Sequence, residues 1–308
     1  MDILMIGHSR SGKTSYMAGL YKEFGNKEKG IGIWTSDYSK QSKLKRIANN
    51  ISRGIYPTGT DIASEYDFWL QIDNRLVIPF NWYDYRGGAL SESSKTSRDA
   101  QKLIEKIENA DALIVFLDGE KIVEDTDEDA EDDYEILLWA IQKAVSRKHL
   151  GSGNYFPISF VITKGDLYSD YSPLYDSDGL EYFTPFFKTI RDGNTVAGMI
   201  SICEVAKTGV YNVFAPLLFS LYYGMPEYIS KRMDAINKEI DYYNTLYPNI
   251  LDDIWTTIFG GTSDRELARK SLQKIEEEKQ NLEYLESMSK DMWDALNSLA
   301  DNNHIIKF

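Results

Sequence analysis

Two glycines, a lysine and a threonine near the start of the chain have the spacing of a loop that binds phosphate groups. Residues 7–14 read GHSRSGKT, which fits the pattern G-x-x-x-x-G-K-T. The glycines let the backbone curl so that successive amide groups point at one phosphate, and Lys13 would neutralise its charge. The Thr14 hydroxyl would bind Mg²⁺. We therefore expect contacts with a nucleotide from Gly7, Ser9, Arg10, Ser11, Gly12, Lys13, Thr14 and Ser15.

A second motif supplies a carboxylate for the same metal ion. Residues 84–87 read DYRG, which has the pattern D-x-x-G and follows a predicted strand. Asp84 could hold Mg²⁺ through a water molecule, and the amide of Gly87 could reach the γ-phosphate. Because only two of its four positions are fixed, this pattern is a weak signal on its own and gains weight only beside the phosphate loop.

A third motif is suited to recognising the base. Residues 163–166 read TKGD and follow a predicted buried strand. A carboxylate there can accept hydrogen bonds from N1 and N2 of guanine, whereas adenine offers no such pair of donors, and the lysine stem would lie along the base. Residues 205–207 read VAK and could place a backbone amide on the guanine O6. The sequence thus favours guanine, with contacts expected from Thr163, Lys164, Asp166, Ala206 and Lys207.

The strands that must position these motifs can be predicted as well. Continuous apolar runs typical of buried parallel strands occupy residues 3–6, 112–118, 157–162 and 199–203. Runs at 66–72 and 76–83 predict an antiparallel hairpin that ends at Asp84. Helical spacing is found at residues 15–24, 39–51, 97–109, 134–145, 179–189 and 210–223. This alternation predicts an α/β fold, a mostly parallel sheet covered on both faces, with one antiparallel edge strand.

After Pro226 the strand signals stop. Residues 228–246 and 263–299 predict two helices, and the second carries an apolar stripe with charged residues outside it. We therefore expect two parts, a main domain over residues 1–225 and a C-terminal helical hairpin over residues 226–308. The hairpin could pack on the main domain, or it could offer a surface to a protein partner.

Composition narrows the function classes. The chain has 308 residues, of which 43% are apolar, and a net charge of -14. Residues 118–135 hold eleven acids and one lysine, so the rest is nearly balanced and gives no support to nucleic-acid or anionic-membrane binding. A single cysteine, Cys203, excludes an internal disulfide and favours the reducing cytoplasm. We expect no signal peptide, because the predicted fold begins at residue 2. We expect no membrane span, because the uncharged stretch at 210–225 has only 16 residues and contains Asn, Pro and Gly.

The four motifs, in this order and each after a predicted strand, resemble those of P-loop GTPases of the Ras-like, translation-factor-related class. The resemblance covers roughly residues 1–225. It implies the P-loop NTPase three-layer sandwich, with GTP or GDP as ligand and Mg²⁺ as cofactor. TKGD departs from the commoner NKxD because Thr163 replaces asparagine. That substitution leaves the base contact of Asp166 in place.

A narrower resemblance concerns the segment before the predicted strand at 66–72. Residues 57–60 read PTGT, similar to bacterial GTPase domains that occur singly or as tandem pairs in conflict and signalling systems, the double-GTPase type. It implies a prokaryotic regulatory or defence-related protein. Thr58 and Thr60 both suit a switch residue that closes on Mg²⁺ when the γ-phosphate is present, and we favour Thr60 as a metal ligand and catalytic residue.

One departure bears on hydrolysis. Ras-like proteins carry a glutamine directly after D-x-x-G to orient the attacking water, and this chain has Gly88. Arg10 occupies the position where guanylate-binding-protein-like and atlastin-like GTPases carry an arginine that acts in cis when two domains meet. We therefore expect slow hydrolysis with Arg10 and Lys13 as catalytic residues, and Arg86 as a second candidate for Arg10. Alternatively, Arg10 could point into solvent or pair with an acid such as Asp84 or Glu204.

These observations predict a guanine-nucleotide switch that hydrolyses GTP to GDP and phosphate with Mg²⁺. Its partners would be the nucleotide and either a GTP-dependent second copy or a protein bound by the C-terminal helices. A scaffold that binds GTP or GDP without hydrolysis is the first alternative, favoured by Gly88. An ATPase in which TKGD occurs by chance is the second. A remodeller of nucleic acid or membranes has little support in the charge distribution.

Overall fold

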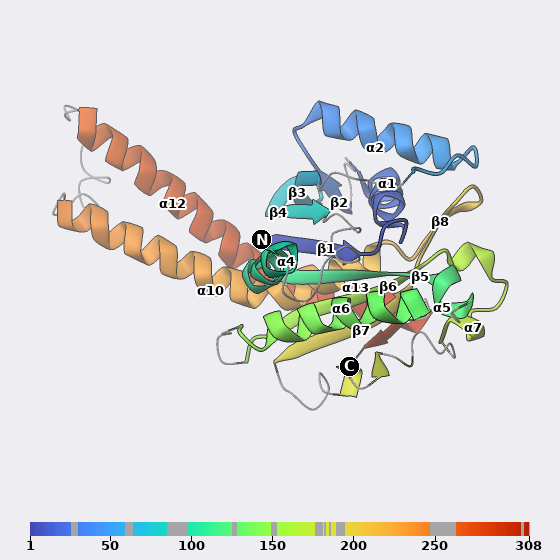
Figure 1. Ribbon diagram of the computed structural model, residues 1–308. Coiled ribbons are helices and arrows are strands. Elements are labelled where there is room, and N and C mark those ends of the chain that lie inside the picture. The colour runs from blue at the N-terminus through green and yellow to red at the C-terminus, as the bar shows by residue number, and fades with distance from the viewer. Residues whose placement is uncertain are drawn as a thin grey trace.

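The computed structural model describes residues 1–25, 30–58, 64–84, 98–124, 128–148, 153–175, 181, 183–184, 186–188, 195–246, 263–302 and 305–307 (Figure 1). Within these residues, eight strands form one sheet in the order β10-β7-β6-β5-β1-β4-β3-β2. They are β1 (Asp2–Gly7), β2 (Ile31–Trp34), β3 (Ser64–Ile72), β4 (Arg75–Asp84), β5 (Ala112–Asp118), β6 (Phe156–Thr163), β7 (Val196–Ile202) and β10 (Ile305–Lys307).

Most of the sheet is parallel. β1 pairs in parallel with β4 and β5, β5 with β6, and β6 with β7. β3 runs antiparallel to β4, as the hairpin signal predicts, and this confirms the predicted α/β fold class. Two strands of this sheet were not predicted: β2 covers the outer edge of β3, and β10 pairs antiparallel with β7 at the opposite edge. β8 (Glu204–Ala206) and β9 (Gly209–Tyr211) form a separate small hairpin.

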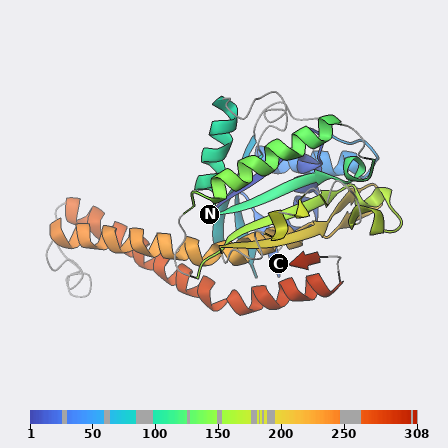
Figure 2. The ribbon, with the colours of Figure 1, turned by 60° about the horizontal axis from the view of Figure 1, so that its bottom comes forward.

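Helices cover both faces of the sheet. α4 and α6 lie on one face, whereas α1, α10 and α13 lie on the other (Figures 1 and 2). A short 3-10 helix spans Gly165–Leu167. The α-helices are α1 (Lys13–Phe24), α2 (Tyr38–Ile51), α4 (Arg98–Asn109), α5 (Gly119–Glu124), α6 (Glu128–Val145), α7 (Ser172–Tyr175), α10 (Phe214–Leu246), α12 (Ser263–Ser287) and α13 (Ser289–Asn302).

The burial of the central strand β5 explains why its sequence is an unbroken apolar run. All seven of its residues are buried. Leu113, Val115 and Leu117 join the core beneath α4 and α6, while Ile114 and Phe116 join the core beneath α1 and α10. Side chains alternate between the two faces of a strand, so a strand covered on both faces buries every position.

The carboxyl ends of the parallel strands meet at one edge of the sheet. The strand register pairs Gly7 with Phe116, Asp118 with Thr163, and Ile162 with Ile202. Segments that follow these strands must therefore come together, although they are far apart in the sequence. In open α/β sheets this edge is where ligands bind.

The predicted helix boundaries in the C-terminal third were wrong. α10 runs without a break from Phe214 to Leu246 and contains Pro226, where we predicted separate helices over 210–223 and 228–246. Proline disfavours a helix interior. In α10, however, the residues from Phe214 to Leu221 and Met225, all of which precede Pro226, are buried. Packing therefore outweighs the local preference. The helix predicted over 263–299 is two helices, α12 and α13. That predicted over 179–189 lies partly outside the described residues.

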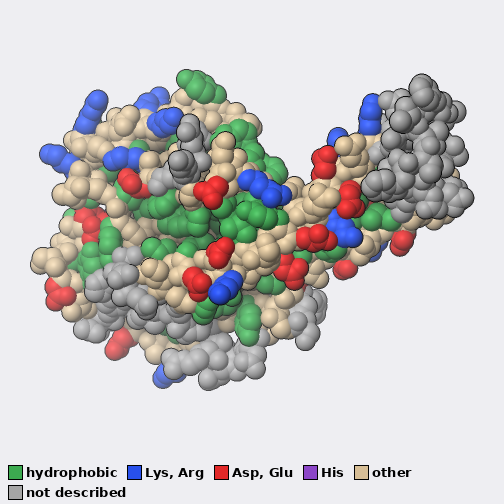
Figure 3. All heavy atoms as spheres, turned by 180° about the vertical axis from the view of Figure 1, so that it is seen from behind, with side chains coloured by type: hydrophobic (Ala, Val, Ile, Leu, Met, Phe, Trp, Pro, Cys, Tyr) green, Lys and Arg blue, Asp and Glu red, His purple; other side chains and the backbone are tan. Residues whose placement is uncertain are grey.

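Beyond residue 226, α10 and α12 extend from the body as a two-helix arm (Figures 1 and 2). Charged side chains of both signs are interspersed along its described part (Figure 3). α13 returns to the body, where Trp293 packs on Tyr222 with ring centroids 5.3 Å apart. The division at residue 225 remains a prediction, because α10 crosses it and β10 joins the main sheet. Across the described segments, no helix combines the length and apolarity needed to cross a membrane.

Candidate functional site

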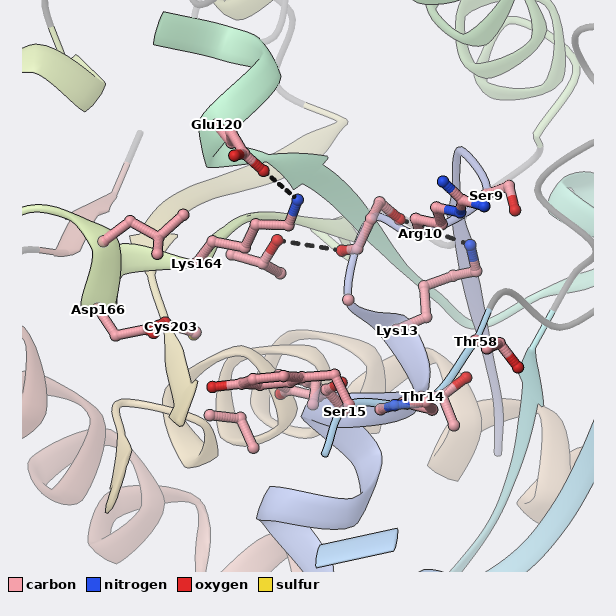
Figure 4. A pocket seen from close by; sticks show the side chains of 18 residues that line it. Ser9, Arg10, Lys13, Thr14, Ser15, Thr58, Glu120, Lys164, Asp166 and Cys203 are labelled. Carbon is pink, nitrogen blue, oxygen red and sulfur yellow. Dashed lines mark hydrogen bonds and ion pairs between the residues drawn. The ribbon is translucent and has the colours of Figure 1, made fainter. Parts of the chain in front are cut away.

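A cavity of about 540 Å³ lies where the parallel strands end (Figure 4). Arg10, Lys13, Thr14 and Thr58 lie at one end of it, and Lys164, Asp166 and Glu120 lie at the other. Its wall is built by residues 9–16 of the loop and α1, by residues 56–58, and by the segments that follow β5, β6 and β7. The cavity therefore joins three of the four sequence motifs with the segment before Thr60.

Two glycines give the loop its shape. Gly12 has φ of 82°, in the left-handed region, and a Cβ there would lie 3.0 Å from Cγ2 of Thr163. Gly7 has φ of 150°, and a Cβ there would lie 2.5 Å from the carbonyl oxygen of Phe116. Only glycine leaves room for this close approach of backbone to backbone. The G-x-x-x-x-G spacing is thus explained by contacts with β5 and β6.

Lys13 holds a positive charge against the inside of the loop. Its side chain is buried, and its Nζ donates to the carbonyl oxygens of Gly7 and His8, both at 2.8 Å. Ser11 Oγ lies 3.5 Å from the same nitrogen. These contacts fix the ammonium group at the end of the cavity where α1 begins. A buried cation at a helix N-terminus suits a phosphate group.

The loop is bonded to the TKGD segment. The Thr163 hydroxyl lies 3.1 Å from the carbonyl oxygens of both Ser11 and Leu117 and can donate to either. Threonine at this position therefore connects the phosphate loop to β6 through its hydroxyl. Thr163, which replaces the asparagine of the commoner NKxD motif, thus still provides a side-chain hydrogen-bond donor at the centre of the site.

Lys164 lies between two carboxylates at the other end of the cavity. Its Nζ donates to Asp118 at 2.7 Å and to Glu120 at 2.9 Å. Although burial acts to lower it, the hydrogen bonds to Asp118 and Glu120 raise the pKa of Lys164 above its ordinary value. Lys164 has φ of 58°, and the 3-10 helix after it carries Asp166 and Leu167 into the cavity wall.

Apolar side chains also line the cavity. Tyr56 and Leu167 line the cavity and are 49% and 56% exposed, respectively. Val205 also lines it, and so does Tyr16, whose hydroxyl donates to the carbonyl oxygen of Val213 at 2.6 Å. A flat ring bound in the cavity would cover part of this apolar surface.

Most of the predicted nucleotide contacts reach the cavity. It is lined by Ser9, Arg10, Ser11, Gly12, Lys13, Thr14, Ser15, Thr163, Lys164 and Asp166. Gly7 lies behind the loop against Phe116. Ala206 is buried in β8, Lys207 is exposed in the turn after it, and neither lines the cavity, where Cys203 and Val205 are found instead. Thr60 and Gly87 lie outside the described residues. Each role remains a prediction.

Some lining residues were missed by sequence reasoning. Tyr56 and Pro57 directly precede Thr58, and Glu120 follows the predicted strand at 112–118 by two residues. Their nearness in sequence to predicted site segments was the one feature from which these three residues could have been predicted. Arg10 is exposed, with φ of 68°, and among the described residues it makes no ion pair. Glu204, one of the acids considered as its partner, accepts a hydrogen bond from Tyr171.

The described residues fit a magnesium ion of the kind that a nucleotide helps to bind. Thr14 and Thr58 present hydroxyl groups to the same end of the cavity. The backbone of Asp84 ends β4 beside Met5 of β1, two residues before the loop. Within the described residues, no group of three or more His, Cys, Asp or Glu residues is placed to hold a metal. Mg²⁺ commonly takes one or two protein oxygens together with phosphate oxygens and water.

Comparison with solved structures found chains of similar shape at low identity. The signal recognition particle receptor SRb-GTP/SRX complex of Chaetomium thermophilum is 13% identical, with a TM-score of 0.37, and the match covers 66% of this chain and 90% of that one. The S. cerevisiae Ski7 GTPase-like domain bound to GTP is 14% identical, with a TM-score of 0.38, covering 66% and 42%. An S. thermophilus NFeoB mutant bound to GDP is 12% identical, with a TM-score of 0.33, covering 99% and 95%.

No curated protein sequence matches the chain. A protein-family model does match, and its description is Double-GTPase 1. The match runs from β1 through the phosphate loop and the D-x-x-G motif to the end of α6, and it stops before TKGD. The resemblance to GTPases predicted from the motifs is therefore confirmed over residues 4–145, which are similar to the Double-GTPase 1 family.

Proposed function

We propose that this protein is a magnesium-dependent GTPase that works as a molecular switch. The observation that carries the proposal is the composition of one cavity. The buried ammonium group of Lys13 lies at one end and the Asp166 carboxylate at the other, and the Thr163–Ser11 hydrogen bond joins the two halves. A phosphorylated guanosine has negative charge at one end and a pair of hydrogen-bond donors at the other, so it matches the cavity in one orientation only.

The proposed roles at the phosphate end follow from the chemistry of the side chains. Lys13 and the amides of the loop bind the β- and γ-phosphates. Thr14, a switch threonine and Asp84 hold Mg²⁺, the last through water, and the ion supplies positive charge where the transition state develops negative charge. Thr58 lines the cavity and Thr60 remains the other candidate for the switch. Gly87 would sense the γ-phosphate through its amide.

Hydrolysis is proposed to be slow without help. The reaction adds water to the γ-phosphorus and releases inorganic phosphate and GDP. Gly88 has no side chain to orient that water. Arg10 is exposed on the loop beside the cavity, so it is placed to act when a second copy or another protein covers the site. Elsewhere, an arginine supplied in this way accelerates hydrolysis by roughly 10³- to 10⁵-fold.

The proposed setting is a prokaryotic regulatory or defence system, as the resemblance to double-GTPase domains suggests. The single cysteine supports a cytoplasmic location. The two-helix arm would contact a protein partner or follow the nucleotide state. Gly88 also supports a second candidate function, a scaffold that binds GTP or GDP without hydrolysing it.

Calorimetric titration with GDP, a non-hydrolysable GTP analogue and ADP, each with Mg²⁺, tests the proposal. We expect binding of both guanine nucleotides, no binding of ADP, and loss of binding in Lys13→Met. Asp166→Asn should shift the preference toward xanthine nucleotides, because the new amide can donate to the C2 oxygen of xanthine. Equal binding of ADP and GDP would exclude guanine selectivity.

Phosphate release separates the two candidate functions. The switch predicts slow release from GTP that increases with protein concentration or with a partner and decreases in Arg10→Ala. The mass of the protein in solution, measured in both nucleotide states, tests GTP-dependent dimerisation. Guanine binding without phosphate release at any concentration or with any partner would favour the scaffold.

A further inference from the structure

The two carboxylates that hold Lys164 differ in their surroundings. The Asp118 side chain is 6% exposed, whereas that of Glu120 is 47% exposed. Asp118 ends β5 and Glu120 lies in the first turn of α5, and neither is part of the TKGD motif. The Lys164 side chain is 31% exposed and its ammonium group contacts both of them. The base end of the cavity thus depends on a second segment of the chain.

The sheet places Asp118 at this point. Asp118 is the last residue of β5 and pairs in register with Thr163, the residue before Lys164. One carboxylate oxygen of Asp118 accepts from Lys164, and the other accepts from the backbone amide of Glu120 at 3.2 Å. Since both oxygens are used, the carboxylate has one orientation, and it holds Lys164 and the start of α5 together.

This arrangement determines which part of Lys164 faces the cavity. The ammonium group lies against Asp118 and Glu120, while Lys164 itself lines the cavity together with Leu167 and Tyr56. The stem of a lysine is four methylene groups, which can cover a flat ring once the charge is held elsewhere. Without these two carboxylates, the long side chain of Lys164 would sample many conformations, and its stem would no longer be fixed in this position.

We propose that Asp118 and Glu120 are positioning residues for base binding, which act by holding the ammonium group of Lys164 so that its stem packs against the base. This inference rests on the proposed guanine-nucleotide function. The two residues contribute unequally, because a buried ion pair with both oxygens bonded is disrupted at greater cost than a half-exposed one. The stem contacts the ring face, which guanine and hypoxanthine share, whereas Asp166 reads the edge, where they differ.

Affinities for GDP and inosine diphosphate test the proposal in four variants: Asp118→Asn, Glu120→Gln, Lys164→Met and the double variant Asp118→Asn/Lys164→Met. Asp118→Asn should weaken both nucleotides by the same factor, at least about tenfold. Glu120→Gln should weaken both by about two- to threefold. The double variant should bind no more weakly than Lys164→Met alone, because Asp118 acts through Lys164.

Asp111→Asn is the matched control. Asp111 directly precedes β5, is largely buried and pairs with Lys231 at 3.4 Å, so its loss tests carboxylate removal at the other end of the same strand. It should leave both affinities within twofold of wild type. If Asp118→Asn does not fold, Glu120→Gln alone and combined with Lys164→Met provides the same test.

Three results would overturn the inference while leaving the proposed function intact. They are unchanged affinity in Asp118→Asn, additive losses in the double variant, and a loss for GDP without an equal loss for inosine diphosphate. A merely structural role would lower the melting temperature and give additive losses. Failure of the wild-type protein to bind any guanine nucleotide would instead overturn the proposed function itself.

Discussion

The Thr163 hydroxyl lies 3.1 Å from the carbonyl oxygen of Ser11, across 152 residues of sequence. The same hydroxyl is equally close to the carbonyl oxygen of Leu117, so it sits between the phosphate loop and the end of β5. All three groups are buried. The two motifs expected to bind opposite ends of one nucleotide are therefore in direct contact. A substitution of Thr163 should change the structure of both motifs.

Thr163→Val keeps the shape of the side chain and removes the hydroxyl. The one hydrogen bond that this hydroxyl donates, to the carbonyl oxygen of Ser11 or of Leu117, would be lost, at a cost of about 1 to 3 kcal/mol. We expect a lower free energy of unfolding and a GDP affinity reduced by about fivefold or more. Urea unfolding and fluorescence titration would measure both. Thr163→Ser retains the hydroxyl and should remain close to wild type in affinity, and an equal loss in the serine variant would contradict the role of the hydrogen bond.

Gly12→Ala should abolish or strongly weaken nucleotide binding. The new Cβ would lie 3.0 Å from Cγ2 of Thr163, and φ of 82° is unfavourable for alanine. The control is Gly30→Ala, since Gly30 has a similar φ of 73° and nothing within 4 Å of its Cβ position. Both variants should lose about 1 kcal/mol of stability through the backbone, but only Gly12→Ala should lose GDP affinity. Equal affinities in calorimetry would show that the loop tolerates the methyl group.

Arg75→Ala should loosen the base of the two-helix arm. The Arg75 guanidinium donates to Asn281 at 2.9 Å and lies 4.0 Å from the ring centroid of Tyr284, so it holds α12 against the start of β4. A hydrogen bond and a cation–π contact at an exposed site are worth about 1 kcal/mol together. Hydrogen exchange over residues 270–287 should accelerate, whereas Lys274→Ala, on an exposed position of α12, should leave it unchanged. Unaltered exchange in Arg75→Ala would mean that α10 alone holds the arm.

Because of Lys148, the free energy of unfolding should change with pH in the alkaline range. Its Nζ donates to the carbonyl oxygens of Glu108 at 2.7 Å and Ala110 at 2.5 Å. Burial, aided by the neighbouring Lys231, lowers the pKa of Lys148 from 10.5 to about 8. Between these values the unfolded chain binds more protons than the folded protein, so the contribution of Lys148 to stability grows as pH rises through this window. The slope is at most about 1.4 kcal/mol per pH unit.

Urea unfolding at pH 7, 8 and 9 would measure this dependence as the difference between wild type and Lys148→Met. As pH rises, the free energy of unfolding of the wild type should increase relative to that of Lys148→Met. Only the wild type has a buried ammonium group that can lose its proton. Lys274→Met, which replaces an exposed lysine on α12, should give a difference that does not change with pH. A constant difference for Lys148→Met would mean that its ammonium group keeps an ordinary pKa.

The sequence alone determined the parts of this protein in which local pattern and chemistry agree. The apolar runs before GHSRSGKT and TKGD predict strands, because their composition suits burial on both faces. The glycine spacing determined the loop, since close backbone approach and left-handed φ exclude other residues. Fold class, the order of the motifs and most of the cavity lining follow from these local facts.

Tertiary structure decided what depends on residues that meet only after folding. Nothing in the local sequence indicates that Asp118 and Glu120 hold Lys164, because that contact follows from the register of β5 and β6. Nor does Pro226 reveal that α10 continues, since burial of the preceding turns supplies stabilisation that a proline rule cannot anticipate. The edge strands β2 and β10 are four and three residues long, too short to carry a pattern, and they exist because β3 and β7 offer unpaired backbone groups.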